Sequence, residues 1–302
     1  MRVADYARLI ALAALWGASF IFTRSASPEF GAIPTAWVRV QLGGLVLIGY
    51  FAAIGFDVGW RRDWRRFALI GVLNSSIPFS LYAFAALNLP ASYSAIFNST
   101  TSLFGATFAA VWLADPLTPR KLAGLVMGIC GVALVAGLGG AETDANFFLA
   151  MAACLCAAVS YATVGVYVRK YARDLEPRAI AGASQMVAGV ILLPLLVLDQ
   201  PKTLDVDIAA NLLGLALLSS GVAYLLYYRL LADVGPSKAL TVTFLIPAFA
   251  MLWGAVFLEE TITLTMLLGT AVIIGGTLLV TSRDRTVTEI ALPEPAGMKG
   301  ER

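Results

Sequence analysis

The sequence predicts an all-α integral membrane protein of ten transmembrane helices, arranged as two inverted five-helix repeats around a central cavity. Two observations lead to this fold class. Of the 302 residues, 59% are hydrophobic and only 13% are charged, and the mean hydropathy is +0.82, a composition typical of membrane proteins. The apolar residues also form ten long runs, and the last five repeat the first five at a constant offset of 145 residues.

Each run is long enough to cross a bilayer, which takes about 20 mainly apolar residues. The runs lack the alternation of apolar and polar residues that marks transmembrane strands, so the spans are predicted to be helical. We expect the first of them to be a retained span rather than a cleaved signal peptide. The predicted spans are residues 7–24, 34–55, 67–88, 91–113, 121–139, 147–168, 178–198, 208–231, 237–258 and 262–281.

The repeat stays in register over its whole length without a gap, which is the signature of a duplicated unit. Matching positions include Arg24/Arg169, Gly44/Gly189, Ser75/Ser220, Tyr82/Tyr227, Ser92/Ser237, Phe104/Phe249, Leu113/Leu258, Thr118/Thr263, Gly124/Gly269 and Gly131/Gly276. Because five crossings are an odd number, the second unit must enter the membrane from the opposite side, which makes the repeat inverted. We expect a first repeat over residues 1–139, a second over 140–281, and a polar, disordered cytoplasmic tail over 282–302.

The placement of Lys and Arg predicts the orientation. If the N-terminus is cytoplasmic, 18 of the 21 Lys and Arg residues lie on that side, as the positive-inside rule requires. Both termini are therefore predicted to be cytoplasmic. The basic loops are explained by this orientation, so they predict no nucleic-acid partner.

The residue inventory argues against several kinds of chemistry. The chain has no histidine, and no carboxylate falls in the middle of a predicted span. Asp115, Glu259 and Glu260 lie at span ends, where a hydrated cap competes with a role in proton coupling. The three cysteines lie inside spans without metal-ligand spacing. We therefore expect no metal, no organic cofactor and no enzymatic activity.

Interrupted helices at matching positions of the two repeats are the best pointer to a solute site in an inverted-repeat protein. Here one runs from Asn74 and Ser75 to Pro78, and the other contains Ser219 and Ser220 followed by glycine. Such residues loosen a helix, and freed backbone groups are tolerated in a membrane only within protein or beside a water-filled cavity. A packing kink without ligand contact is the alternative.

Aromatic and polar side chains accompany both interruptions. The eight-residue spacing from Asn74 to Tyr82 and from Ser219 to Tyr227 predicts that each pair shares one helical face. Further candidates for the same cavity wall are Trp16, Asn98, Tyr224 and Thr243. Rings and hydroxyls of this kind suit an aromatic or zwitterionic solute, although packing between membrane helices would use the same residues.

Arg39 is the only Lys or Arg that lies inside a predicted span rather than at one of its ends. A buried guanidinium would receive a substrate carboxylate or pair with a carbonyl. Because Arg39 lies close to the end of its span, the alternative is that its side chain reaches up to the lipid headgroups.

Glycines form small-residue faces on the fifth and tenth spans, which allow helices to approach closely. They are Gly124, Gly128 and Gly131 in the fifth span and Gly269, Gly275 and Gly276 in the tenth. These faces predict helix packing within the chain or dimerisation, so we expect a monomer or a weak homodimer surrounded by membrane lipid.

With these features the chain resembles the drug/metabolite transporter superfamily, in its ten-span branch with paired EamA-type repeats. The resemblance covers residues 7–281. It rests on the run from Leu15 to Phe20, on Arg39, on Ser92 and Ser237 at the span entries, and on Phe257-Leu258-Glu259-Glu260. One departure is Ala114-Asp115, where the second half has two glutamates.

The resemblance implies a basket of helices around a central solute cavity, alternating access, and peripheral fifth and tenth spans. It also implies a bacterial inner-membrane exporter of small metabolites, with aromatic or neutral amino acids as the first expectation because bacterial aromatic amino acid exporters look similar. The absence of mid-span carboxylates favours facilitated transport. The alternatives are proton-coupled export of drugs or other metabolites, and a membrane scaffold that transports nothing.

Overall fold

The computed structural model describes residues 1–138 and 144–281, with residues 138, 236 and 237 described by their backbone only, and every regular element in this part of the chain is helical. The predicted tail at 282–302 lies outside the described residues. The α-helices are α1 (Val3–Phe30), α2 (Ala32–Ala53), α3 (Trp60–Gly71), α4 (Ile77–Ala85), α5 (Ala91–Asn98), α6 (Thr101–Trp112), α7 (Pro119–Leu138), α8 (Ala145–Tyr171), α9 (Pro177–Leu192), α10 (Val206–Leu213), α11 (Ala223–Val234), α12 (Pro236–Ala239), α13 (Val242–Phe257) and α14 (Leu264–Thr281).

Eight helical stretches in the described residues are long and apolar enough to cross a membrane. Three of them are composite: α3 continues into α4, α9 continues into the 3₁₀ turn η2 (Leu193–Val197), and α10 continues into α11. The other two predicted spans are divided. One breaks between α5 and α6, where Ser99 and Thr100 bond back to the carbonyls of Ile96 and Phe97, and the other breaks between α12 and α13.

Both interruptions predicted from the sequence are present, and both are π-helical. Segment η1 (Val72–Ser76) joins α3 to α4, and η3 (Gly214–Val222) joins α10 to α11. The Ser76 hydroxyl donates to the Gly71 carbonyl five residues earlier, at 3.3 Å. A π-helical turn contains an extra residue, and such turns are frequent at functional sites.

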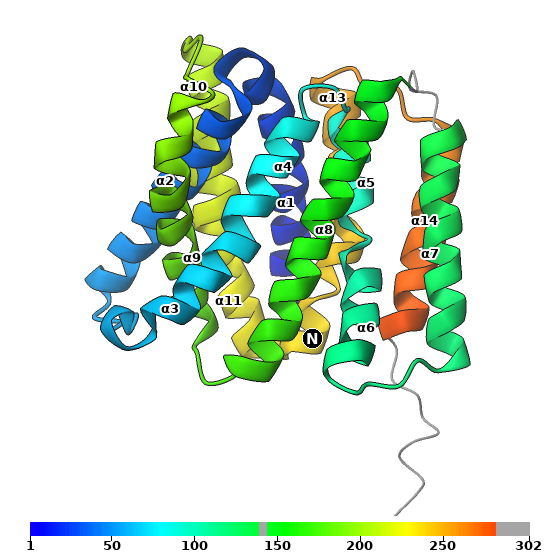
Figure 1. The fold of residues 1–302 in the computed structure, drawn as a ribbon, viewed down its shortest axis with the longest axis horizontal. Coiled ribbons are helices and arrows are strands. Elements are labelled where there is room, and N and C mark those ends of the chain that lie inside the picture. The colour runs from blue at the N-terminus through cyan, green and yellow to red at the C-terminus, as the bar shows by residue number, and fades with distance from the viewer. Residues whose placement is uncertain (139–143, 282–302) are drawn as a thin grey trace, which may run out of the picture.

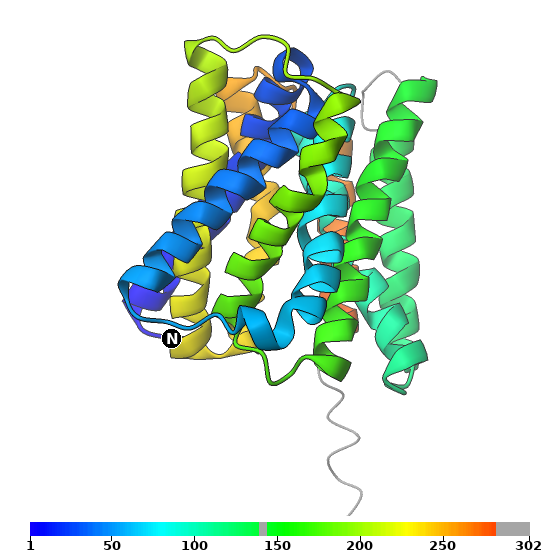
Figure 2. The same ribbon diagram turned by 60° about the vertical axis from the view of Figure 1, so that its left-hand side comes forward.

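The helices run side by side between the two ends of the molecule, with α7 and α14 together at one edge (Figures 1 and 2). Their glycines face each other. A Cβ added to Gly124 would lie 2.5 Å from the Gly276 carbonyl oxygen, and one added to Gly131 would lie 2.9 Å from that of Gly269. The predicted small-residue faces are therefore used for packing within the chain.

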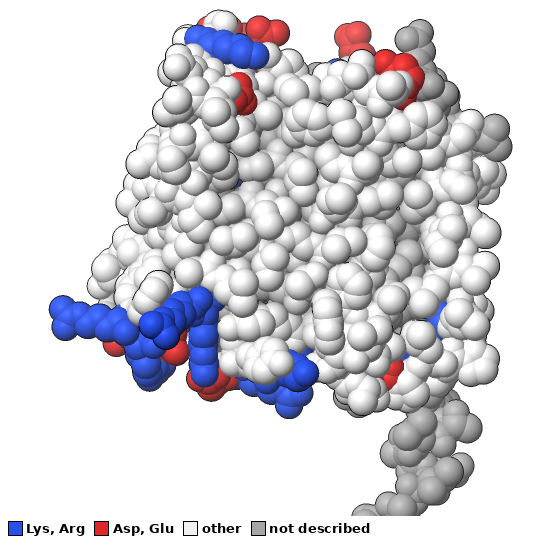
Figure 3. Space-filling model, viewed as in Figure 1, with Lys and Arg blue, Asp and Glu red and all other residues white. Residues whose placement is uncertain are grey.

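On the face shown in Figure 3, the charged side chains gather near the two ends of the molecule, with a broad, largely uncharged band between them. Lys and Arg dominate the end at which the N-terminus lies (Figures 1 and 3). The start of α3 contributes to this end, where Arg66 pairs with Asp174 at 2.7 Å and Arg62 with Asp63 at 2.7 Å. The Arg66 guanidinium lowers the pKa of the Asp174 carboxyl below its usual value.

Candidate functional site

Two aromatic contacts between the halves lie near the interrupted helices. Trp16 on α1 contacts Tyr227 on α11, with ring centroids 5.4 Å apart, and Tyr161 on α8 stacks on Tyr82 of α4 at 6.4 Å. The repeat offset converts Trp16 into Tyr161 and Tyr82 into Tyr227. The two contacts are thus the same contact made twice, with the halves exchanged.

Further rings extend both pairs. Trp16 also packs edge-on against Tyr224 at 6.0 Å, and Tyr161 packs against the cluster that contains Phe79, the repeat counterpart of Tyr224. Phe20 packs edge-on against Tyr82, and Tyr228 contacts Tyr224 and Tyr227. We call Trp16, Phe20, Phe79, Tyr82, Tyr161, Tyr224, Tyr227 and Tyr228 the aromatic cluster.

Arg39 on α2 lies against this cluster and is buried, with 9% of its surface exposed. Its guanidinium carbon lies 3.8 Å from the centre of the Phe79 ring, and its Nε donates a 3.2 Å hydrogen bond to the Ser220 hydroxyl. Among the described residues, no carboxylate forms an ion pair with Arg39, and Tyr82, Tyr161 and Tyr224 lie near its guanidinium. The alternative that the side chain reaches to the headgroups is therefore wrong.

The repeat makes the Arg39 contact asymmetric. Its counterpart in the second half is Ser184, which accepts a 3.4 Å hydrogen bond from Ser75, the counterpart of Ser220. One half thus has a cation where the other has a hydroxyl. The positive charge lies on a single side of the aromatic cluster, which would orient an anionic group bound there.

Polar partners of the tyrosines come from the interrupted helix and from α5. The Tyr82 hydroxyl donates to Asn98 Oδ1 at 2.8 Å, and the Asn74 side chain lies near the Tyr224 hydroxyl. These contacts have different partners, so the shared helical face of Asn74 and Tyr82 stays a prediction. Asn74 itself lies within the π-helical segment η1.

Three predicted site residues use their hydroxyls in hydrogen bonds within the protein. The Ser219 hydroxyl donates to the Leu15 carbonyl of α1 at 2.9 Å, and Ser75 is fully buried on Ser184. Thr243 donates to the Leu240 carbonyl three residues earlier. The structure thus brings together Trp16, Arg39, Asn74, Tyr82, Asn98, Ser220, Tyr224 and Tyr227.

Two further aromatic residues of the cluster, Tyr161 and Phe79, are related by the repeat offset to Trp16 and Tyr224. Sequence reasoning left Gln185 out of the site. Gln185 is fully buried, and neither its amide oxygen nor its nitrogen has a hydrogen-bond partner among the described residues. A Cβ on Gly43 would lie 2.7 Å from both Gln185 Oε1 and Ser220 Cβ, so this amide lies close to the Arg39 contact.

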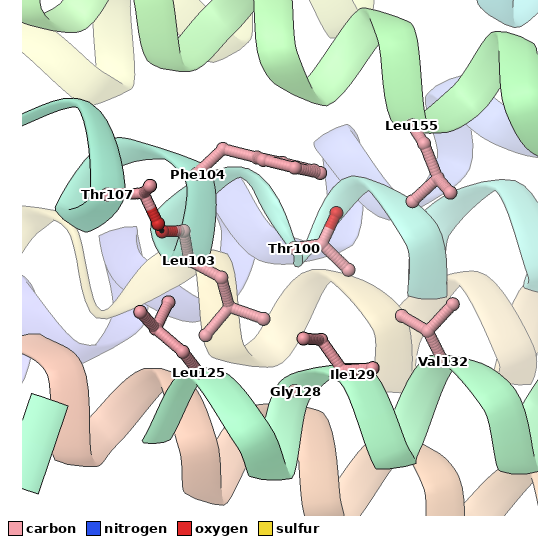
Figure 4. A pocket seen from close by; sticks show the side chains of 9 residues that line it. All are labelled: Thr100, Leu103, Phe104, Thr107, Leu125, Gly128, Ile129, Val132 and Leu155. Atoms are coloured by element: carbon pink, nitrogen blue, oxygen red, sulfur yellow. Dashed lines mark hydrogen bonds between the residues drawn. The ribbon is translucent and has the colours of Figure 1, made fainter. Parts of the chain in front are cut away.

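A separate pocket of about 340 Å³ lies among α6, α7 and α8 (Figure 4). Its walls are apolar and include Leu103, Phe104 and Ile129. Its two threonines, Thr100 and Thr107, donate to carbonyls of their own segment. Because this pocket has no free polar group and none of the Arg39 contacts, it is distinct from the aromatic cluster. In the described residues no three His, Cys, Asp or Glu side chains gather as a metal site requires.

These features describe a multi-span membrane protein with two related halves that meet at a polar and aromatic centre. The sequence profile of the EamA-like transporter family matches twice, at residues 6–137 and 148–282. The chain belongs to this family, which lies within the drug/metabolite transporter superfamily.

Several relatives align over most of their own length and of this chain. The chain is 27% identical to Protein PecM of Dickeya dadantii over 88% of each chain. It is 24% identical to the uncharacterized transporter YvbV of Bacillus subtilis, over 93% of this chain and 92% of the relative. It is also 24% identical to a probable terminal-alkyne amino-acid exporter of Streptantibioticus cattleyicolor, over 91% and 92%. A crystal structure at 20% identity aligns with a TM-score of 0.64 over 93% of this chain and 97% of the other, which shows that the fold is shared.

Proposed function

We propose that this transporter exports small metabolites that carry a carboxylate, with aromatic or neutral amino acids as the first candidates. The observation that carries the proposal is Arg39, a buried cation set among aromatic rings with no acidic partner in the described residues. A guanidinium has five N–H donors, and within the described part of the chain one of them has a partner, the Ser220 hydroxyl. An uncompensated buried charge is costly, and a bound carboxylate would relieve this cost.

The surroundings of Arg39 suit the rest of an amino acid. Aromatic solute side chains gain from edge-on or offset stacking on Trp16 and the tyrosines. An ammonium group is attracted to the faces of such rings, and the Asn98 and Asn74 amides add hydrogen-bonding capacity. The name of the Streptantibioticus relative, a probable amino-acid exporter, agrees with this substrate class.

The proposal includes ten crossings in two inverted repeats, and cytoplasmic termini in the bacterial inner membrane. The eight long stretches would supply eight of these crossings, α5 together with α6 the ninth, and α12 together with α13 the tenth. Contacts that recur with the halves exchanged, such as Trp16 with Tyr227 and Tyr82 with Tyr161, support a pseudo-two-fold relation of the kind that inverted repeats have. The basic end that carries the N-terminus supports the orientation.

Transport then consists of rocking the two halves about the aromatic cluster, so that it opens to each side in turn. We propose facilitated transport driven by the solute gradient, because the charged group beside the cluster is an arginine, which does not release its proton. Proton-coupled export of drugs or other metabolites is the competing function.

The test is flux of a labelled amino acid panel through the purified protein in liposomes, with and without a pH gradient, against empty liposomes. We expect saturable flux of aromatic or neutral amino acids at a rate that does not depend on the pH gradient. Flux that depends steeply on the gradient would replace facilitated transport by proton coupling. Absence of amino acid flux, together with flux of cationic drugs, would overturn the proposed substrate class.

A further inference from the structure

The loop after α13 makes a contact with α5 that the proposed binding site does not use. The Glu260 carboxylate accepts hydrogen bonds from the backbone nitrogens of Ala91 at 2.6 Å and Ser92 at 3.0 Å, and a short one from the Ser92 hydroxyl. Helix α5 begins after Pro90 and has no side-chain cap of its own. A residue of the second half therefore supplies the cap of a helix of the first half.

The backbone around Glu260 is shaped for this contact. Glu259 adopts a left-handed φ of 53°, which is uncommon for a residue with a side chain. The Glu260 nitrogen donates back to the Gly254 carbonyl at 3.1 Å. Gly254 provides the space for this contact, because a Cβ there would lie 2.6 Å from Glu260 Oε2 and 2.8 Å from the Ser92 hydroxyl.

The repeat places Asp115 at the position of Glu260, with the same turn but a different contact. Ala114 has a left-handed φ of 52°, and the Asp115 nitrogen donates to the Ala109 carbonyl, the counterpart of Gly254. The Asp115 carboxylate pairs with Lys121 within its own half, at 2.6 Å, and 41% of its side chain is exposed. The counterpart of Lys121 is Met266, so Glu260 has no such neighbour to compete with α5.

The two turns lie at opposite ends of the molecule. The α6–α7 turn is at the end where the N-terminus lies, and the α13–α14 turn is at the other end (Figure 1). An inverted-repeat transporter changes state when its halves exchange conformations. In the part of the chain that the structure describes, the Glu260 contact is made in one half and not at its counterpart, so it is a contact that distinguishes the two states.

We infer that Glu260 is a latch that holds the end of the molecule opposite the termini closed, and that Asp115 is the corresponding latch for the other end. This inference rests on the alternating access of the proposed function. In the opposite state the Glu260 carboxylate no longer contacts α5. The Asp115 carboxylate then gives up its ion pair with Lys121 and contacts residues 236–237, which the repeat relates to residues 91–92. Position 236 is proline and lacks the backbone donor that Ala91 supplies. The Asp115 latch is thus the weaker one, and the resting state is closed at the Glu260 end.

The test follows the accessibility of one cysteine, Asn98→Cys, in a variant whose three native cysteines are replaced. A membrane-impermeant thiol reagent is added to one side of oriented vesicles at a time, without any transported solute. Glu260→Gln should raise the labelling rate from the Glu260 end by about fivefold, the effect of losing one helix cap, and lower it from the other end. Gly254→Ala should act in the same direction, because it displaces the carboxylate without removing its charge.

Two further variants serve as matched controls for Glu260→Gln. Glu259→Gln removes an adjacent exposed carboxylate and should leave both rates unchanged, whereas Asp115→Asn should shift labelling in the direction opposite to Glu260→Gln. If Glu260→Gln raises labelling from both ends equally, or if Asp115→Asn shifts it in the same direction, the contact is merely structural and the inference is wrong. No solute enters this assay, so its outcome is independent of whether amino acids are the substrate.

Discussion

The packing of α7 on α14 predicts opposite effects on folding stability for two substitutions in α7. Gly124→Ala puts a Cβ 2.5 Å from the Gly276 carbonyl oxygen, whereas ordinary contact begins at 3.4 Å, so the helices must separate by roughly 1 Å. Overpacking of this kind costs about 1–3 kcal/mol. Gly137→Ala in the same helix meets nothing within 4 Å and gains up to about 1 kcal/mol of helix propensity.

The assay is thermal unfolding of both variants in the same detergent, followed by tryptophan fluorescence and by the monodisperse fraction that remains. Gly124→Ala should unfold at a lower temperature than the wild type, and Gly137→Ala should not. Gly276→Ala, on the other side of the same contact, should match Gly124→Ala. Equal stability of Gly124→Ala and Gly137→Ala would refute the inference that these glycines hold the two helices in close contact.

Two further predictions concern the aromatic cluster and the basic end. Tyr82→Phe removes the hydroxyl that bonds Asn98 and should reduce transport several-fold at unchanged expression. The control Tyr6→Phe changes an exposed tyrosine near the N-terminus and should transport normally. Equal flux through both variants would show that the Tyr82 hydroxyl is not part of the site. The lowered pKa of Asp174 beside Arg66 means that its carboxylate stabilises the fold above its unfolded pKa, near 3.8, and loses that effect only as the pH falls through its lower folded pKa. The difference in unfolding temperature between wild type and Asp174→Asn should therefore be the same at pH 7 and pH 5, and a difference that vanishes by pH 5 would contradict the pairing.

Hydrophobic run length was sufficient to predict an all-helical membrane protein and the places of its long apolar helices. The predicted span 121–139 corresponds to α7 and 262–281 to α14, with ends that differ by about two residues. Both interruptions were predicted because Pro78 and the serines near it disfavour a regular helix. Their π-helical form was not predicted, because it depends on the helices packed around them.

The pairings within the site were harder to predict because they cross between the halves. Helical periodicity predicts that Asn74 and Tyr82 share one face, but it cannot predict that Asn74 lies near Tyr224 of the other half. Ser219 repeats the position of Asn74, yet its hydroxyl is used by the Leu15 carbonyl. Burial of Arg39 could not be inferred from its place near a span end, because a long side chain can point either way. Contacts between segments far apart in sequence decided each case.

The central claim, that Arg39 receives a substrate carboxylate, is tested most directly with matched solutes. An aromatic amino acid and its decarboxylated amine would compete for flux through the wild type and through Arg39→Gln in liposomes. Hydrogen bonds to a charged group contribute about 1.5–3 kcal/mol, so the wild type should prefer the amino acid by about 10- to 150-fold, and the variant should lose this preference. The same preference in both proteins would contradict the claim.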